Sequence, residues 1–300
     1  MSSSLPVVIE VALNGATRPE LNPHAPQTQE ALVEDALVCI DAGATVLHTH
    51  APDISVGGRA GADAYLEHFR PVLERHPEVV LYPTLVFADT VEEKTSHIPF
   101  LAEAGLRMGF VDPGSLNLGP TDDTGLPMTA GIVYANSHAD IAYKFELCER
   151  LGLAPGMAIF EPGFLRTAIA WYEAGRMPQG ALVRLYLGGE SSYRGDGLTD
   201  LLFGLPPTPA SLDTYVDMME ARSVDLPWSV AVVSGSTVEN GVAHRALERG
   251  GHLRVGLEDY AGVERKSNVE LVREAVAECE RAGRPVARAD EMAKILALPR

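Results

Sequence analysis

Two histidines separated by a single residue, His48 and His50, end a short apolar run with the composition of a β-strand. Side chains two positions apart on a strand point to the same face, so both imidazoles can enter one cavity. Neutral imidazole is a common ligand of Zn²⁺, and two imidazoles need a third ligand to make a catalytic site. The spacing therefore predicts a divalent metal site, with a pair of hydrogen-bonding core histidines as the alternative.

A second group of chemically capable residues lies in the run from Arg254 to Asp259. A carboxylate after the last predicted strand can complete a set of two histidines and one acid, which leaves positions open for water or substrate. Because Glu258 and Asp259 are neighbours, we expect one to bind the metal and the other to act as a base. Arg254, if it faces inward, is a fixed cation suited to a carboxylate or enolate oxygen. The alternative is a solvated acidic turn with a surface ion pair.

Hydroxyl side chains near two further strand ends, Thr84 and Ser115, are candidate donors to a substrate. Each is also common as an ordinary loop hydrogen bond. The sequence contains no GxSxG nucleophile elbow, Walker loop, CxxC pair or HExxH helix. The two histidines and the acidic run are therefore the main chemical signal in the chain.

Short β-rich runs alternate with helical patterns along the whole chain, and eight of each are predicted. The predicted strands are Val7–Leu13, Thr45–His50, Val79–Thr84, Met108–Val111, Gly156–Phe160, Leu182–Leu187, Trp228–Val233 and Leu253–Gly256. The predicted helices lie near residues 27–42, 61–75, 91–104, 137–151, 163–174, 209–221, 238–249 and 266–282. Gly43 is expected to end the first helix.

Eight strand–helix units in 300 residues predict an α/β fold, a (βα)8 TIM barrel that forms a single domain over residues 1–300. A doubly wound open sheet also alternates strands and helices. It would favour a glycine-rich phosphate turn after the first strand, which the segment from Asn14 to Arg18 does not match. Two long loops are expected at about 117–138 and 188–208, and both follow strand ends on the face where barrels build their active sites.

Composition narrows the classes of partner. The net charge of −17 disfavours nucleic acid and anionic membranes, because both require clustered Lys and Arg. No apolar run approaches the roughly 20 residues that span a bilayer, and the N-terminus lacks the features of a signal peptide. Three widely separated cysteines argue against a disulfide framework. We therefore expect a soluble, cytoplasmic protein that acts on small molecules.

Four stretches of the chain together resemble the β-keto acid cleavage enzymes. They are Ala12–Gly15, Ala42–His50, Gly114–Gly119 and Gly250–Asp259, and the similarity runs from about Val7 to Leu298. The resemblance implies a zinc-dependent barrel, assembled as a homotetramer. It also implies a reaction in which a β-keto acid and acetyl-CoA give acetoacetate and a new acyl-CoA.

The resemblance assigns roles to the two groups of residues. Zinc would be bound by His48, His50 and Glu258, with Asp259 as the base and Arg254 assisting it. Four residues would contact the substrate: Asn14, Thr17, Thr84 and Ser115. The residues that bind CoA are not identified by the sequence.

The chain departs from the family where the substrate would bind. Thr17 stands where the aminohexanoate-cleaving member has an acid for the substrate's ammonium group. The fifth strand of the family usually carries PE-x-E, with a glutamate beside the metal, whereas this chain has Pro155-Gly156-Met157-Ala158. After His50 the chain reads Ala51-Pro52-Asp53, where arginine and acids are usual. Since an unpaired charge in a cavity is costly, we predict that neutral or anionic β-keto acids are preferred over 3-keto-5-aminohexanoate.

Two other functions remain as alternatives. One is a metal-dependent aldolase or hydrolase on the same barrel that uses no CoA. The other is a non-catalytic ligand-binding barrel, which the missing glutamate at Ala158 would suit. Within the main hypothesis, Glu161 or a metal-bound hydroxide is an alternative to Asp259 as the base.

Overall fold

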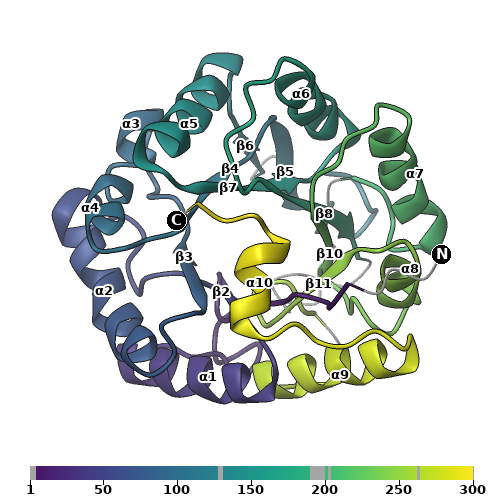
Figure 1. Ribbon diagram of the computed structural model, residues 1–300, viewed down its shortest axis with the longest axis horizontal. Helices are drawn as coiled ribbons and strands as arrows, with labels where there is room; N and C mark the ends of the chain where they lie inside the picture. Colours follow the sequence, from purple (N-terminus) through teal and green to yellow (C-terminus); the bar gives the residue numbers. More distant parts are fainter. Residues whose placement is uncertain (1–4, 128–130, 190–199, 202–203, 262–263, 300) are drawn as a thin grey trace.

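The computed structural model describes residues 5–127, 131–189, 200–201, 204–261 and 264–299. Within them, eight parallel strands form one sheet in the order β3-β2-β1-β11-β10-β8-β7-β4. The two ends of this order, β3 and β4, lie in contact, which brings the sheet round to a nearly closed barrel (Figure 1). The strands are β1 (Ile9–Ala12), β2 (Val46–Thr49), β3 (Val80–Pro83), β4 (Met108–Val111), β7 (Ala154–Ile159), β8 (Leu182–Gly188), β10 (Trp228–Val233) and β11 (His252–Val255). Each corresponds to one predicted strand, so the predicted barrel is confirmed.

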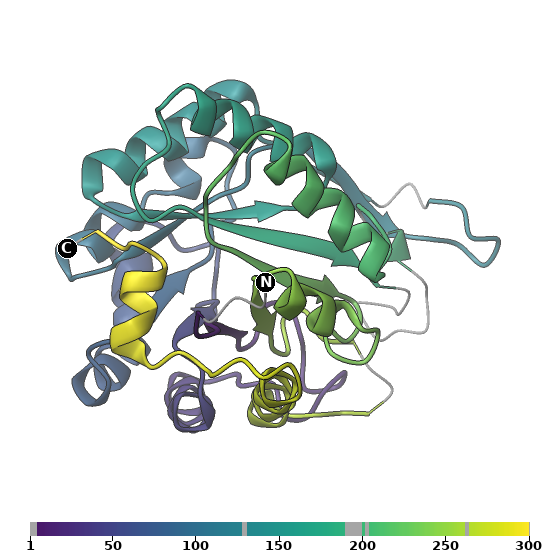
Figure 2. The same ribbon diagram turned by 45° about the vertical axis from the view of Figure 1, so that its right-hand side comes forward.

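Helices form an outer layer around these strands, as Figures 1 and 2 show. They are α1 (Gln29–Ala42), α2 (Gly58–Arg75), α3 (Val91–Lys94), α4 (Ile98–Glu103), α5 (His138–Leu151), α6 (Pro162–Glu173), α7 (Pro209–Glu220), α8 (Val242–Glu248) and α9 (Asn268–Arg281). A last helix, α10 (Ala289–Ile295), lies outside this layer. Helix starts follow local chemistry: the Thr28 side chain accepts the Ala31 N–H, and Ser137 and Asp140 form a capping box at α5. Gly43 ends α1, as the sequence predicts.

Alternation along the strands divides the buried residues into two sets. Ile9 and Val11 of β1 belong to the core between the strands and the surrounding helices. Val8 belongs instead to a smaller cluster inside the barrel, made by residues near the strand starts together with Met292 and Leu296. Those last two residues lie on or beside α10, the helix drawn across the middle of the ring in Figure 1. Helix α10, which the sequence analysis did not predict, therefore closes the amino-terminal end of the barrel with apolar side chains.

The two predicted long loops contain more structure than expected. Strands β5 (Leu116–Pro120), β6 (Ile132–Tyr134) and β9 (Asp200–Leu201) form a small antiparallel sheet outside the barrel. In Figure 2 the β5–β6 connection projects to the right of the barrel. Much of the second loop, including the segment from Tyr193 to Asp196, lies outside the described residues.

One predicted helix, near residues 91–104, is divided into α3 and α4. Two hydroxyls bond back to the chain at the break: Thr95 Oγ1 donates to the Val91 carbonyl, and Ser96 Oγ donates to the Glu93 carbonyl. Such local side-chain bonds compete with a regular helix ladder. Thr95 and Ser96 therefore interrupt the helix, and the apolar periodicity used for the prediction does not register this effect.

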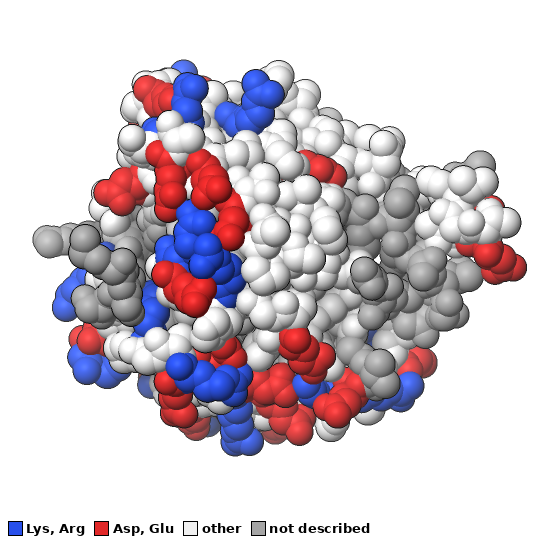
Figure 3. All heavy atoms as spheres, turned by 90° about the vertical axis from the view of Figure 1, so that its right-hand side faces the viewer, with Lys and Arg blue, Asp and Glu red and all other residues white. Residues whose placement is uncertain are grey.

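The surface agrees with the acidic composition. On the face drawn in Figure 3, basic side chains lie among acidic ones rather than in a patch of their own. Among the described residues, no helix is both long and apolar enough to pass through a bilayer.

Candidate active site

The three predicted metal ligands meet at the carboxyl ends of β2 and β11. The Nε2 atom of His48 lies 3.3 Å from one carboxylate oxygen of Glu258, and the Nε2 atom of His50 lies 3.2 Å from the other. One ligand atom from each residue lies within 4.8 Å of the others. Two donors held by one zinc ion at about 2.1 Å in tetrahedral geometry lie about 3.4 Å apart. The three side chains therefore have the spacing of a metal site.

The protonation states also suit a metal. The Nδ1 atom of His48 lies 3.2 Å from the Tyr82 carbonyl, so a proton on Nδ1 leaves the Nε2 lone pair facing Glu258. Burial lowers the pKa of His48, which favours the neutral ring. Burial alone would raise the pKa of Glu258, but His48, His50 and Arg254 hold it well below its usual value. Neutral imidazole and ionised carboxylate are the forms that bind metal ions.

An unsatisfied atom supports the same reading. The Nε2 atom of His50 is buried and makes no hydrogen bond, although it lies 3.2 Å from a Glu258 oxygen. Buried polar atoms nearly always have a partner, and a lone nitrogen beside a carboxylate and a second imidazole is explained by a shared cation. The residues present thus fit a divalent ion with two nitrogen ligands and one oxygen ligand.

The loop after β1 contacts the segments that carry His50 and Glu258. The Asn14 amide donates to the His50 carbonyl at 3.0 Å, and its oxygen accepts the His50 N–H at 2.9 Å. Thr17 donates its hydroxyl to the Leu257 carbonyl at 2.5 Å. Gly15 has a φ of +52°, and a Cβ atom there would lie 2.3 Å from Cγ of Glu258. The predicted substrate residues Asn14 and Thr17 therefore position the ligands, and their contact with substrate stays a prediction.

We expect Gly15→Ala to weaken zinc binding by about 10–100-fold, the usual effect of disturbing the groups that orient metal ligands. The added methyl group must displace the Glu258 side chain. A competition titration with a chelator measures the zinc affinity. Gly58→Ala is the matched control, because Gly58 has a φ of +60° but nothing within 4 Å of its Cβ position. Equal zinc affinity in the two variants would contradict the positioning role.

Arg254 joins the candidate base to the metal ligands. It is only 2% exposed, and its Nε donates to Asp259 at 2.7 Å while Nη2 donates to Glu258 at 3.1 Å. Its Nη1 donates to Glu10 at 2.6 Å and to the Tyr82 hydroxyl at 2.7 Å. A planar guanidinium with its donors used on three sides is fixed in orientation. Arg254 therefore holds Asp259 and Glu258 in one arrangement.

Asp259 has the electrostatic setting of a proton acceptor. Burial is the largest of the effects that together raise its pKa to about 6, and Arg254 opposes it. The neighbouring Glu258 carboxylate also raises this pKa, since two like charges so close disfavour each other. A carboxyl group that titrates near neutrality can both take and return a proton during turnover.

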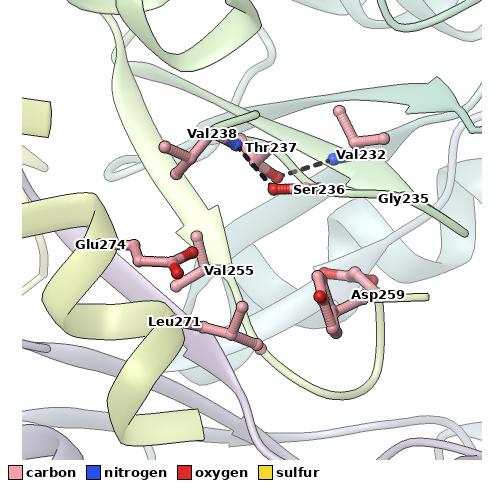
Figure 4. Close-up of a pocket in the computed structure, with 11 residues that line it drawn as sticks. Val232, Gly235, Ser236, Thr237, Val238, Val255, Asp259, Leu271 and Glu274 are labelled. Carbon is pink, nitrogen blue, oxygen red and sulfur yellow. Dashed lines mark hydrogen bonds between the residues drawn. The ribbon is translucent and has the colours of Figure 1, made fainter. Parts of the chain in front are cut away.

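A small cavity of about 10 Å³ lies beside Asp259, between the ends of β10 and β11 and helix α9 (Figure 4). On its upper wall in that view, the Thr237 hydroxyl accepts the Val232 N–H at 3.1 Å and donates to the Arg254 carbonyl at 3.2 Å. The Ser234 N–H also donates to the Asp259 carbonyl at 2.8 Å. The loop after β10 thereby fixes the backbone on both sides of the Arg254–Asp259 pair.

A larger cavity of about 120 Å³ opens at the carboxyl ends of the strands. His48 and Glu258 lie on one side of it, together with Arg254. Its other walls are largely aromatic, formed by Tyr82, Phe110, Tyr134, Phe160 and Tyr186. Asp112 and Arg184 add charged groups to this wall, and aromatic walls with a few placed polar groups are typical of small-molecule sites. The cavity can therefore hold a small substrate against the three metal ligands.

The other predicted residues are placed as follows. Thr84 lines the cavity. Ser115 is exposed, and its hydroxyl is bonded to the backbone of Asn136. Glu161, the alternative base, accepts the Gly204 N–H at 2.7 Å. Thr84 thus lies in the wall of the cavity that His48 and Glu258 also line. The polar side-chain atoms of Ser115 and Glu161 are instead hydrogen-bonded to the backbone.

Two buried charges that the sequence analysis did not single out complete the network. Glu10 is 1% exposed and accepts from Arg254, Arg184 and the Tyr82 hydroxyl. Arg184 and Arg254 hold the pKa of Glu10 at about 2 although burial alone would raise it. Both Glu10 and Arg184 are flanked by apolar residues in their strands, at positions that face the barrel interior. A lone charge within an apolar strand was the signal available for finding them.

Comparison with known proteins gives a consistent picture. A sequence model described as beta-keto acid cleavage enzyme matches residues 6–298. The 3-keto-5-aminohexanoate cleavage enzyme of Fusobacterium nucleatum is 25% identical over 297 residues, which cover 97% of this chain and 98% of that protein. The 3-oxoadipate:acetyl-CoA acetyltransferase of Cupriavidus necator is 24% identical over 299 residues, which cover 98% and 95%.

Among solved structures, apo ObcA superposes with a TM-score of 0.70 at 19% identity. The match covers 93% of this chain and 66% of that chain, so this chain spans slightly less than two thirds of ObcA. At this identity the likeness concerns the fold alone.

Proposed function

Because the chain belongs to the beta-keto acid cleavage enzyme family, we propose that it transfers carbon units between a β-keto acid and acetyl-CoA. The products are acetoacetate and the acyl-CoA of the substrate's remaining acyl group. Relatives named as acetyl-CoA-dependent transferases of keto acids support this reaction class. The observation that carries the proposal is the meeting of His48, His50 and Glu258 with the Arg254–Asp259 pair at one end of the barrel.

We assign zinc to the three converging ligands. Two imidazoles and one carboxylate form a common catalytic zinc set that leaves a position for substrate. When bound there, the ion would act as a Lewis acid toward the keto and carboxylate oxygens of the substrate. The protein supplies the ligand geometry, through Asn14 and Gly15, and the apolar walls that exclude water.

Proton removal is assigned to Asp259. Its carboxylate would take a proton from the carbon between the keto and carboxylate groups, which leaves a carbanion at that carbon. Arg254 keeps the carboxylate in place through its 2.7 Å bond and stabilises the negative charge beside it. Glu10 and Tyr82 in turn fix the far side of Arg254.

The carbanion would then attack the thioester carbonyl of acetyl-CoA, forming a carbon–carbon bond and releasing the CoA thiolate. That thiolate attacks the original keto carbon of the substrate. The bond between this carbon and the former carbanion carbon breaks, which gives the new acyl-CoA and the enolate of acetoacetate. Asp259, protonated in the first step, returns its proton to that enolate.

We expect turnover of a β-keto acid to require acetyl-CoA and to release one acetoacetate for each acyl-CoA formed. A panel of β-keto acids, assayed with the zinc-loaded protein and scored for both products, measures this. Turnover without acetyl-CoA would instead favour a metal-dependent aldolase or hydrolase. Tight binding of keto acids without any turnover would favour a non-catalytic ligand-binding barrel.

A further inference from the structure

Arg184 lies in the wall of the large cavity as a buried cation. Its side chain is 3% exposed, and Nε donates to the two oxygens of Glu10 at 3.0 and 2.8 Å. The Glu10 carboxylate is shared, since it also accepts from Arg254 at 2.6 Å. Arg254 has two further carboxylate partners, Glu258 and Asp259, whereas Glu10 is the one carboxylate among the described residues to which Arg184 donates.

The outer nitrogens of Arg184 lack a strong acceptor. Nη2 donates to the Met108 thioether at 3.0 Å, and sulfur is a weak acceptor. Nη1 makes no hydrogen bond to any residue that the structure describes. A guanidinium group has five N–H donors, and Arg184 lines the cavity, so Nη1 can donate to a group bound there. The cavity wall thus presents donors whose partner is not part of the described protein.

Gly156 provides the space for this arrangement. A Cβ atom at position 156 would lie 1.9 Å from Nη1 of Arg184 and 2.8 Å from Cζ. Both Gly156 and Arg184 line the cavity, so the edge of the guanidinium group beside Gly156 belongs to the cavity wall. Any larger residue at this position would push the cation away from its present place.

Tyr82 relates Arg184 to the candidate metal site. The centre of the His48 ring and the guanidinium carbon of Arg184 each lie 4.5 Å from the centre of the Tyr82 ring. The His48 ring and the Arg184 guanidinium group therefore both contact the same tyrosine ring. His48 and Arg184 line the same cavity, so one substrate can contact the candidate metal site and Arg184 together.

We propose that Arg184 binds an anionic group at the distal end of the substrate, so that the preferred substrate is a β-keto acid with a second carboxylate. The inference rests on the proposed function, because it names the substrate class for that site. It narrows the predicted preference for neutral or anionic keto acids to the anionic class. A carboxylate accepting from Nη1 would form a charge-assisted hydrogen bond with this donor.

Binding of two substrates of equal chain length tests this proposal. The pair is 3-oxoadipate and 3-oxohexanoate, which differ only in a carboxylate or a methyl group at the distal end. Isothermal titration of the zinc-loaded protein, without acetyl-CoA, gives a Kd for each. We expect the diacid to bind about tenfold more tightly or better, the usual effect of a charge-assisted hydrogen bond.

Three variants locate the effect. Arg184→Gln should bring the ratio of the two Kd values close to one, and Gly156→Ala should lower it by displacing Nη1. Arg222→Gln removes an exposed arginine that pairs with Glu173, and should leave the ratio unchanged. Because each ratio is measured within one protein, a general loss of folded or metal-loaded protein cancels.

Equal binding of the two acids by the unaltered protein would overturn the proposal, as would an unchanged ratio in both Arg184→Gln and Gly156→Ala. The activity assay separates this failure from that of the reaction. Tighter binding of the diacid without acetyl-CoA-dependent product would sustain the role of Arg184 and refute the proposed reaction. Turnover of both acids with equal Kd values would support the proposed reaction and refute the role of Arg184.

Discussion

Replacing His50 with alanine should remove most of the zinc and lower kcat/KM by at least about a thousandfold. Two remaining ligands rarely hold zinc. The Lewis-acid contribution of a bound ion is worth several kcal/mol, and each 1.4 kcal/mol or so changes a rate tenfold. His48→Ala should behave alike, because the two imidazoles contact opposite oxygens of the same Glu258 carboxylate. Elemental analysis of the purified proteins gives the zinc content per chain.

His138→Ala is the control for this experiment. His138 is exposed at the start of α5, and its removal should leave about one zinc per chain. Full metal retention in both the His48 and the His50 variants would refute the assignment of the site. If the unaltered protein contains another divalent metal in place of zinc and is fully active, only the identity of the ion is refuted.

Asp259→Asn should lower kcat by about 10²–10⁴-fold, the usual contribution of a general base, while zinc content and KM stay nearly unchanged. The asparagine amide keeps the size of the side chain but cannot take the proton. Its contact with Arg254 Nε is preserved through the amide oxygen. Steady-state kinetics and zinc analysis on the same preparation separate loss of chemistry from loss of metal.

Glu258→Gln is the companion variant, because its side chain touches His48, His50 and Arg254. It should lose zinc affinity and activity together, since a neutral amide is a poor replacement for a carboxylate ligand. If Asp259→Asn keeps a near-normal kcat and Glu161→Gln does not, Glu161 rather than Asp259 is the base. The present bond between Glu161 and the Gly204 N–H favours a structural role for that residue.

Local sequence patterns were sufficient to predict the strands of the barrel and the shared face of His48 and His50. The eight predicted strands all appear, because each is a short apolar run whose β-rich composition and flanking turns are local properties. His48 and His50 share a face because strands repeat every two residues. Helix periodicity was less reliable where side chains compete with the backbone, as Thr95 and Ser96 do between α3 and α4.

The network behind the ligands required the tertiary structure. Glu10 and Arg254 are 244 residues apart in the chain, and Glu10 and Arg184 are 174 apart, yet they form buried ion pairs. Which inward-facing charges meet depends on the strand order β1-β11-β10-β8 and its closure, and no local pattern records that order. Gly15 is similar, since its need to be glycine comes from Glu258 lying against it.

The sequence by itself therefore determined the eight strands of the barrel and most of the helices around them, and it identified the residues that we propose for metal binding and proton transfer, because composition, periodicity and side-chain type are properties of single segments. Only the tertiary structure decided how those groups are held and charged. Burial raises the pKa of Asp259 while the same environment lowers that of Glu258, although the two carboxylates are adjacent in the chain. The difference arises from their distances to His48, His50 and Arg254 in a cavity of low polarity, and such distances exist only once the barrel has closed.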